Sequence, residues 1–322
     1  MTALGLLLQS TERRLARAGI PDARLEADLI WMTALDLDRT QLYGALRDTP
    51  TPEHTASAED LIARRLRHEP AAYLMGRREF YGLDLHVAPG VLIPRQDTET
   101  LVEEALRLAW TTGAFLSATV PSPSFPRRRE SRNVGAGPTF AQGENREALR
   151  RDHGDIVIAD VGCGSGAIAI ALAVHLPAAA IYAVDVSIRA LEVTALNAKR
   201  HGVDGRIRLL QGDLLAPLPG PVHLITANLP YVMSAEIPTL DPEIRLHEPR
   251  EALDGGDDGL DLVRRLLTDA SAHLMPHGAV LLEMDPRQIV AATHYAAGVM
   301  PSAQVRAVRD LAGRERVLVV ET

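Results

Sequence analysis

The sequence predicts an α/β protein in which a mainly parallel sheet is covered by helices on both faces and is preceded by a small all-helical domain. Two observations lead to this prediction. From Asp155 onward, short apolar runs alternate with stretches of helical spacing. In residues 1–72, by contrast, the apolar positions follow helical spacing throughout. A strand-and-turn pattern between the two regions predicts a β-hairpin linker.

Composition limits the class of protein. The chain has 322 residues, of which 46% are hydrophobic and 24% charged, so it is long enough for two domains with a full hydrophobic core. Cys163 is the single cysteine, which excludes an internal disulfide, and no Cys or His pair has metal-ligand spacing. We therefore expect no metal and a reducing compartment.

The location and the partners follow from charge and apolar runs. No run approaches the roughly 18 apolar residues of a membrane span, and the N-terminus has the reverse order of a secretory signal. We therefore expect a cytoplasmic protein with no membrane contact. The net charge of −8 argues against a broad nucleic-acid-binding surface and favours a protein or small-molecule partner.

The helical domain is expected over residues 1–72. Thr51-Pro52-Glu53 is typical of a helix start, with a proline in the first turn. Over residues 73–96, the turn residues Gly82 and Pro89-Gly90 separate short apolar runs. We expect this linker to form one or two hairpins.

The third region, residues 97–322, carries the predicted sheet and an insertion at 112–154. The insertion is rich in Pro, Ser, Gly and Arg and has no periodicity, and loops longer than about 15 residues are uncommon in compact domains. We expect it to be disordered. Its arginines at 127–129 and 132 are compatible with a nucleic-acid patch, but a solvated linker is the simpler interpretation.

The elements of the sheet domain can be placed in order along the chain. Because the last two strands are joined by four residues, they should form an antiparallel hairpin, whereas the others should be parallel and bind ligands at their carboxyl ends. The expected strands lie at 155–162, 180–185, 206–213, 222–228, 279–284, 304–310 and 315–321, and the expected helices at 97–111, 167–176, 188–201, 260–274 and after Pro286.

A glycine-rich sequence, ADVGCGSGA at 159–167, follows the first of these strands and precedes a helix. Glycines allow a tight turn and a close ligand, and the helix that follows offers free N–H groups. This context predicts a nucleotide-like cofactor, although the spacing also fits a dinucleotide fingerprint and many tight turns bind nothing. The candidate cofactor-binding residues are Gly162, Cys163, Gly164, Ser165 and Gly166.

Acidic residues end three successive strands. Asp185 is placed to accept hydrogen bonds from ribose hydroxyls, with a helix N-cap as the alternative, and Asp213 to accept one from an adenine amino group. Asp160 adds negative charge. This arrangement suits an uncharged ribose and adenine with a cationic tail better than a pyrophosphate. We therefore favour S-adenosyl-L-methionine as the cofactor over NAD.

The fourth strand ends in Asn228-Leu229-Pro230-Tyr231. The Asn228 carboxamide oxygen and the Leu229 carbonyl can each accept one hydrogen from a planar –NH2 group, and Tyr231 can pack on that group or near a cationic methyl. An amide or an aromatic amine would then be held in line with the methyl. The alternative is an Asn that caps its own turn beside a buried Tyr.

The sequence resembles the glutamine methyltransferases of peptide chain release factors. The resemblance covers nearly everything outside 112–154 and rests on RHEPAAYLMGRREFYGLDLHVAPGVLIPRQDTETLVEEAL at 67–106, DVGCGSGAIAIALA at 160–173, EPREALDGGDDGL at 248–260, LLEMDPRQ at 281–288 and RDLAGRERVLVV at 309–320. It implies a class I S-adenosylmethionine-dependent methyltransferase, with a Rossmann-like seven-stranded sheet, a helical substrate-recognition domain and a hairpin linker. The product of the cofactor would be S-adenosyl-L-homocysteine.

The resemblance also implies roles for single residues. Gly162 to Gly166 would contact the methionine part of the cofactor, Asp185 its ribose, and Asn228 to Tyr231 the substrate glutamine, with Asn228 close to the cofactor as well. Arg95, Thr98 and Glu99 would shape the substrate channel or stabilise the domain junction. The partner would be a release factor, and we expect a monomer with no direct contact to nucleic acid.

Two positions depart from the family pattern. Leu229 replaces the usual proline, which keeps the carbonyl acceptor but loses rigidity, and Leu214 replaces an aromatic residue beside the adenine. Asn-Leu-Pro-Tyr is also typical of ribosomal RNA adenine dimethyltransferases. The alternatives are therefore a glutamine methyltransferase acting on a ribosomal protein, an adenine amine methyltransferase on RNA or DNA, a dinucleotide-dependent oxidoreductase, and a non-catalytic binding protein.

Overall fold

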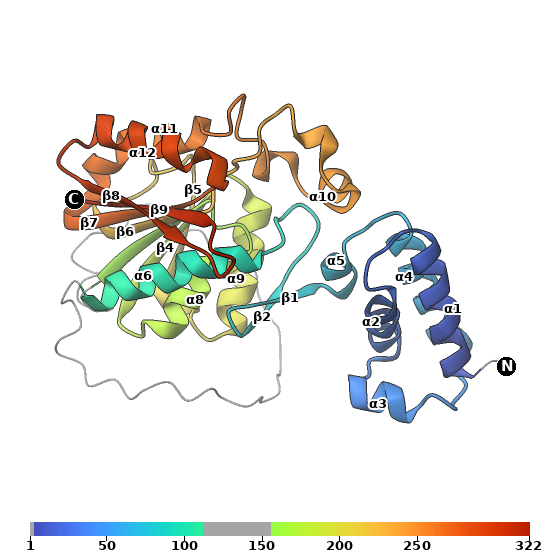
Figure 1. Cartoon of the computed structure of the whole chain (residues 1–322). Coiled ribbons are helices and arrows are strands. Elements are labelled where there is room, and N and C mark those ends of the chain that lie inside the picture. The colour runs from blue at the N-terminus through green and yellow to red at the C-terminus, as the bar shows by residue number, and fades with distance from the viewer. Residues whose placement is uncertain (1–2, 112–155) are drawn as a thin grey trace. The chain divides into compact units, whose positions relative to one another are not determined.

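The computed structural model describes residues 3–111 and 156–322 (Figure 1). The insertion predicted at 112–154 lies outside the described residues. The chain divides into two compact units. Unit 1 contains residues 1–78, 86–93 and 236–250, and unit 2 contains residues 79–85, 94–235 and 251–322.

Unit 1 is helical. Its helices are α1 (Leu4–Arg17), α2 (Ala23–Leu35), α3 (Arg39–Gly44), α4 (Pro52–Arg65), α5 (Ala71–Met75) and α10 (Pro242–His247). The predicted start of α4 is confirmed, since the Thr51 side chain accepts a hydrogen bond from the His54 N–H. Apolar residues from α1, α2 and α4 form the core around Trp31, whose indole N–H donates to the Thr11 hydroxyl at 3.0 Å.

Residues 236–250 join this helical unit through charge. The Arg65 side chain is buried, donates to Glu26 at 2.9 Å and also pairs with Glu243 on α10. A buried guanidinium needs such partners, because an unpaired charge away from water is strongly unfavourable. The sequence gives no sign of this pairing, since Arg65 and Glu243 lie 178 residues apart.

The hairpin consists of β1 (Arg77–Phe80) and β2 (Leu83–His86). The two residues between the strands, Tyr81 and Gly82, have φ values of 51° and 73°. Positive φ at both central residues is the geometry that matches the twist of two-residue hairpins.

Unit 2 is built on a seven-stranded sheet of order β5-β4-β3-β6-β7-β9-β8. β9 runs antiparallel to both of its neighbours, as predicted for the last two strands, and the other pairs are parallel. The strands are β3 (Ile156–Val161), β4 (Ala179–Asp185), β5 (Ile207–Gln211), β6 (Val222–Ala227), β7 (Leu274–Glu283), β8 (Gln304–Arg309) and β9 (Glu315–Glu321).

Helices cover both faces of this sheet (Figure 1). Helices α6 (Glu99–Thr111), α8 (Ala167–His175) and α9 (Ile188–Arg200) contribute to one buried apolar core, and α11 (Asp261–His273) and α12 (Ile289–Val299) to the other. The doubly wound α/β architecture predicted from the alternation is confirmed. Short 3-10 turns lie at Gln96–Thr98, Asp204–Arg206, Ile237–Thr239, Arg250–Ala252 and Pro286–Gln288.

The strand order fixes where a ligand can bind. From β3 the chain proceeds to β4 and β5 on one side, and β6 and β7 lie on the other side of β3. Open α/β sheets bind ligands beyond the carboxyl ends of the strands at this kind of reversal. Over the two described ranges, no helix is both long enough and apolar enough to cross a membrane.

Candidate active site

The glycine loop and the Asn-Leu-Pro-Tyr turn lie side by side at the reversal of strand order. Val161 on β3 is paired with Ala227 on β6, so Gly162 and Asn228 are the next residues on neighbouring strands. A Cβ at Gly162 would lie 3.4 Å from Leu229 Cδ2 and 3.9 Å from the Asn228 carbonyl oxygen. The φ of Gly162 is 71°. Both predicted motifs therefore belong to one site.

The glycine loop is held by backbone contacts and by α9. The N–H groups of Gly162 and Cys163 both donate to the Val184 carbonyl, at 2.8 and 3.0 Å. The Thr194 hydroxyl donates to the Gly164 carbonyl at 3.0 Å, and the Asn197 amide donates to the Ser165 carbonyl at 2.9 Å. These bonds fix the path of the loop.

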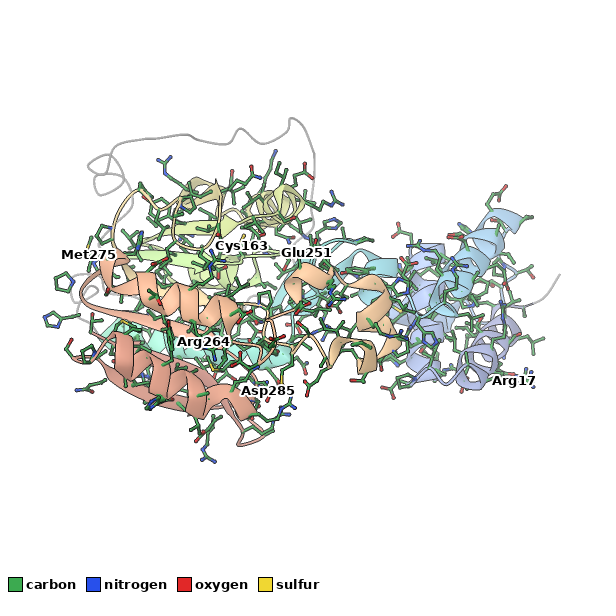
Figure 2. The ribbon with its side chains drawn as sticks, turned by 90° about the horizontal axis from the view of Figure 1, so that it is seen from above. Arg17, Cys163, Glu251, Arg264, Met275 and Asp285 are labelled. Carbon is green, nitrogen blue, oxygen red and sulfur yellow. The ribbon has the colours of Figure 1, made fainter. Side chains whose placement is uncertain are left out.

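Two loop side chains are directed into the protein. Cys163 is buried with its Sγ 3.5 Å from Thr194 Oγ1, and burial raises the pKa of the thiol well above its usual range (Figure 2 labels Cys163). Ser165 is also buried. Gly166 is required by packing, because its φ is 80° and a Cβ would lie 2.8 Å from Thr194 Cγ2. The loop therefore has its backbone, rather than its side chains, to offer to a cofactor.

Asp185 connects the glycine loop to the end of β4. Its Oδ2 accepts the Gly164 N–H at 2.9 Å, and its Oδ1 accepts the Ser187 N–H at 2.9 Å. Burial raises the pKa of this carboxyl. The N-cap of α9 is Ser187, whose hydroxyl accepts from the Ala190 N–H, so Asp185 does not serve as that cap.

Asp160 is buried and connects neighbouring elements of the sheet domain. It is 0% exposed, its Oδ2 accepts the Ala169 N–H of α8 at 3.0 Å, and the Thr226 hydroxyl donates to its Oδ1 at 3.3 Å. Burial raises its pKa to about 7, and the nearby charge of Asp185 adds to that rise. The side chain thus links β3 to α8 and β6.

Asp213 and Leu214 follow β5 and differ in exposure. The Asp213 carboxylate is more than half exposed and pairs with Arg265 of α11 at 2.5 Å. Leu214 is buried among the apolar residues of the core and has a φ of 48°, which is unfavourable for a residue with a Cβ. Strained backbone of this kind is often found near ligand sites.

The Asn-Leu-Pro-Tyr turn has its own set of partners. The Asn228 Nδ2 donates to Thr98 Oγ1 at 3.1 Å, which uses its –NH2 group and leaves Oδ1 as the acceptor. The Leu229 side chain is buried against the glycine loop. The Tyr231 carbonyl accepts from Gln288 Nε2 at 2.8 Å.

The EALDGGDDGL stretch supports the same turn. The Val232 N–H donates to the Leu253 carbonyl at 2.9 Å, and the Gly255 N–H donates to the Val232 carbonyl at 2.9 Å. A Cβ at Gly255 would lie 2.6 Å from the Pro230 carbonyl oxygen, and one at Gly259 would overlap the Tyr231 carbonyl. Glycine is therefore needed at both positions, because the 251–260 segment packs directly against the backbone of the Asn-Leu-Pro-Tyr turn.

Glu283, which ends β7 in LLEMDPRQ, is not among the site residues predicted from the sequence. Leu282 is paired with Ala227, so Glu283 and Asn228 are the next residues on these neighbouring strands. Its side chain is 1% exposed, and the Tyr231 hydroxyl donates to its Oε1 at 3.4 Å. Burial raises its pKa to about 7, while Thr98 and Arg316 act in the opposite direction. The sequence signal that could have identified Glu283 is an acidic residue at the end of an apolar strand.

The other predicted channel residues, Arg95 and Glu99, and their neighbour Asp97 have partners of their own. Arg316 of β9 pairs with Asp97 at 3.0 Å, and Arg314 pairs with the same carboxylate at 3.3 Å, which holds the turn that carries Thr98. Glu99 accepts the Tyr81 N–H at 2.9 Å in the hairpin turn. Arg95 is near enough to Tyr231 for its charge to counteract the rise in the tyrosine pKa that burial causes. Among residues 3–111 and 156–322, no group of three or more His, Cys, Asp or Glu is arranged to hold a metal.

Comparison with known proteins decides the family. Residues 7–76 match the PrmC N-terminal domain, and residues 147–241 match the methyltransferase small domain. The release factor glutamine methyltransferase of Geobacter sulfurreducens is 38% identical over 279 residues, which are 86% of this chain and 82% of that protein. The chain belongs to the release factor glutamine methyltransferase family. That of Moorella thermoacetica is also 38% identical, over 94% of this chain and 93% of that protein.

A solved structure of a release-factor-specific protein-(glutamine-N5) methyltransferase, from Alicyclobacillus acidocaldarius, is 26% identical and covers 74% of this chain and 98% of that chain, with a TM-score of 0.37. The family that the sequence motifs predicted is confirmed. The class I methyltransferase fold is confirmed by the domain match together with the seven-stranded sheet. The alternatives with an RNA, DNA or ribosomal protein substrate are not favoured by relatives that carry the release factor glutamine methyltransferase name.

Proposed function

We propose that this enzyme transfers a methyl group from S-adenosyl-L-methionine to the side-chain amide nitrogen of the glutamine in the Gly-Gly-Gln loop of peptide chain release factors. The observation that carries the proposal is the contact between the glycine loop and a turn whose Asn228 carboxamide has Oδ1 as its acceptor. Membership of the family supplies the substrate.

The residues of the glycine loop fit this cofactor. Gly162 lets the backbone be approached, and Asp185, at the loop, supplies a carboxylate to ribose hydroxyls. No lysine or arginine belongs to the 160–167 loop, which suits a cationic tail better than a pyrophosphate. We place the adenine near Asp213 and Leu214, and we assign Asp160 to support of the loop. When bound, the cofactor supplies an electrophilic methyl group on a cationic sulfur.

The turn holds the acceptor amide. Asn228 Oδ1 and the Leu229 carbonyl accept the two hydrogens of the substrate –NH2, and Tyr231 packs beside it. An amide nitrogen is a poor nucleophile because its lone pair is delocalised, so two acceptors that favour positive charge on the –NH2 lower the barrier. The N–C bond would form as the bond between the methyl carbon and the cofactor sulfur breaks, with that electron pair staying on the sulfur, and one amide proton would pass to water. The substrate becomes N5-methylglutamine, and the cofactor leaves as S-adenosyl-L-homocysteine.

Each region of the chain has its own role in this proposal. The helical domain of residues 1–72 recognises the release factor, residues 73–96 link it to the catalytic part, and residues 97–322 form the methyltransferase domain. Residues 236–250 belong with the helical unit through the Arg65 and Glu243 pair, so the chain beyond the Asn228 turn is part of recognition as well. The enzyme acts as a monomer, in the cytoplasm, where release factors function, without direct contact to nucleic acid.

The test is a transfer assay with labelled S-adenosyl-L-methionine. The purified protein is incubated in turn with a release factor, with the same factor carrying alanine in place of the Gly-Gly-Gln glutamine, with ribosomal protein and with RNA. We expect label only on the unaltered release factor. Labelling of RNA, or equal labelling of the alanine factor, would contradict the proposal.

A further inference from the structure

Two buried groups that do not belong to the predicted motif lie against the Asn-Leu-Pro-Tyr turn. Thr98, which is 4% exposed, accepts the Asn228 Nδ2–H at 3.1 Å, and Glu283, which is 1% exposed, accepts the Tyr231 hydroxyl. They come from the segment before α6 and from the end of β7, 130 and 52 residues from their partners. Each holds one polar side chain of the turn.

We propose that Thr98 and Glu283 are positioning residues, which together orient the Asn228 carboxamide and the Tyr231 ring for the substrate amide. The inference rests on the proposed function, because it assigns the orientation of the same two side chains. Neither residue touches the substrate in this account. They act through Asn228 and Tyr231.

The orientation of Asn228 follows from counting donors and acceptors. A carboxamide has one acceptor end and one donor end, and only the acceptor end can hold a substrate –NH2. With Nδ2 bonded to Thr98, Oδ1 is the end available to the substrate. Without the Thr98 hydroxyl, the carboxamide loses the contact that distinguishes its two ends, and the flipped form would direct a donor at a donor.

Glu283 determines whether the Thr98 hydroxyl accepts a hydrogen bond from Asn228 Nδ2 or donates one to Asn228 Oδ1. A threonine hydroxyl donates one hydrogen, and since Thr98 Oγ1 accepts from Asn228, its own hydrogen needs another acceptor. The ionised Glu283 carboxylate can only accept, and the Thr98 hydroxyl lowers the pKa of Glu283 and so favours this form. Glu283 Oε2 has no close hydrogen-bond partner among the described residues, so acceptor capacity is available there. A protonated Glu283 could instead donate to Thr98, which would free the threonine hydrogen for Asn228 Oδ1.

The charge of Glu283 is set by groups from several elements. Tyr231 follows β6, Thr98 and Asp97 precede α6, and Arg316 lies on β9. Arg316 and the two hydroxyls favour the ionised carboxylate, whereas burial and Asp97 oppose it. The turnover number should therefore rise with pH as Glu283 ionises. The 3.4 Å separation between Tyr231 and Glu283 is long for a hydrogen bond and should shorten when substrate binds.

The experiment compares Thr98→Val, Thr98→Ser and Glu283→Gln with the wild type, on an intact release factor. Wild-type transfer is measured first, because its absence would contradict the proposed function itself and not the positioning. Thr268→Val, which removes a hydroxyl on α11 outside the site, is the control for the loss of a threonine hydroxyl. For each variant, kcat, KM, the calorimetric Kd of S-adenosyl-L-methionine and the unfolding midpoint are recorded from pH 6 to 9.

We expect Thr98→Val to lower kcat by at least about tenfold with the cofactor Kd within about twofold, and Thr98→Ser to recover most of the loss because it keeps the hydroxyl. Glu283→Gln should lower kcat and remove the rise of kcat with pH, since glutamine must present a donor to one of its two donor neighbours. Thr268→Val should match the wild type.

Three results would overturn the proposal: an unchanged kcat in Thr98→Val, an equal loss in Thr98→Ser and Thr98→Val, or an unchanged pH profile in Glu283→Gln. If Thr98→Val does not fold, two other measurements still test the proposal. The kcat of Glu283→Gln must not change with pH, and the kcat of Thr98→Ser must stay close to that of the wild type.

Discussion

The two halves of the candidate site are held in different ways. The glycine loop is fixed by the next strand and helix along the chain, through contacts of Asp185, Thr194 and Asn197 that span 21 to 32 residues. The Asn-Leu-Pro-Tyr turn is fixed by side chains that lie 52 to 130 residues away. The proposed cofactor half is therefore a local structure, and the proposed substrate half depends on the assembly of the whole unit.

This difference has a consequence for substitutions. A change in the loop or its neighbours should affect the affinity for the cofactor, whereas a change in the distant supports of the turn should affect transfer to the substrate. Leu229 is the point where the two halves meet, because its side chain packs against Gly162.

Gly259→Ala should be the most damaging change. A Cβ there would overlap the Tyr231 carbonyl and the Gln288 side chain, and the φ of 76° is unfavourable for alanine. Overpacking and left-handed backbone together should lower the free energy of unfolding by about 3–5 kcal/mol. Gly313→Ala is the matched control, with a φ of 78° and open space, and should cost about 1 kcal/mol. Equal losses for the two variants in urea denaturation would show that packing against the turn is unimportant.

Glu283→Gln should change how stability depends on pH. Because the pKa of Glu283 is raised from 4.5 to about 7, its contribution is fully present below pH 4.5 and is lost as the pH rises through 7. Glutamine has no such titration, so the wild type should lose about 3 kcal/mol relative to the variant across this interval. Urea unfolding of both proteins at pH 5 and pH 8 measures the change. A stability difference that is the same at both pH values would mean that Glu283 has an ordinary pKa.

Asp185→Asn should weaken the binding of S-adenosyl-L-methionine by about 10- to 100-fold, because an amide group would meet the Gly164 or Ser187 N–H that the carboxylate now accepts. Asp213→Asn should weaken it by less than about tenfold, since that carboxylate is exposed and its pair with Arg265 contributes about 1 kcal/mol or less. Calorimetric titration of both variants makes the comparison. A larger loss for Asp213→Asn would move the main polar contact of the cofactor to the end of β5.

The parts of the fold that the sequence predicts are those with local signals. Alternating apolar runs located the strands and helices of unit 2, and the four residues between the last two strands predicted their antiparallel pairing. The start of α4 was predicted because its signal, Thr51-Pro52-Glu53, lies within three consecutive residues. The strand order and the pairing of residues 236–250 with the helical unit depend on contacts between distant segments, and no periodic pattern records them.

The candidate site divides in the same way. Gly162 and Asn228 could be placed together from the sequence, because both follow strands that a doubly wound sheet brings to one edge. The inward direction of Asp160 and Cys163, the ion pair of Asp213 and the role of Glu283 could not be predicted, since each depends on which side chain lies opposite. An acid at the end of a strand has the same sequence signal whether it faces a ligand or a helix N-terminus.

The most direct test of the account is Asn228→Ala, studied by labelled transfer to a release factor and by calorimetric titration with S-adenosyl-L-methionine. If the turn holds the substrate amide and the glycine loop holds the cofactor, transfer should fall by at least about 100-fold while the cofactor Kd stays within about threefold of the wild type. A cofactor affinity that falls in parallel with transfer would place Asn228 in the cofactor site and contradict the division of the site into two halves.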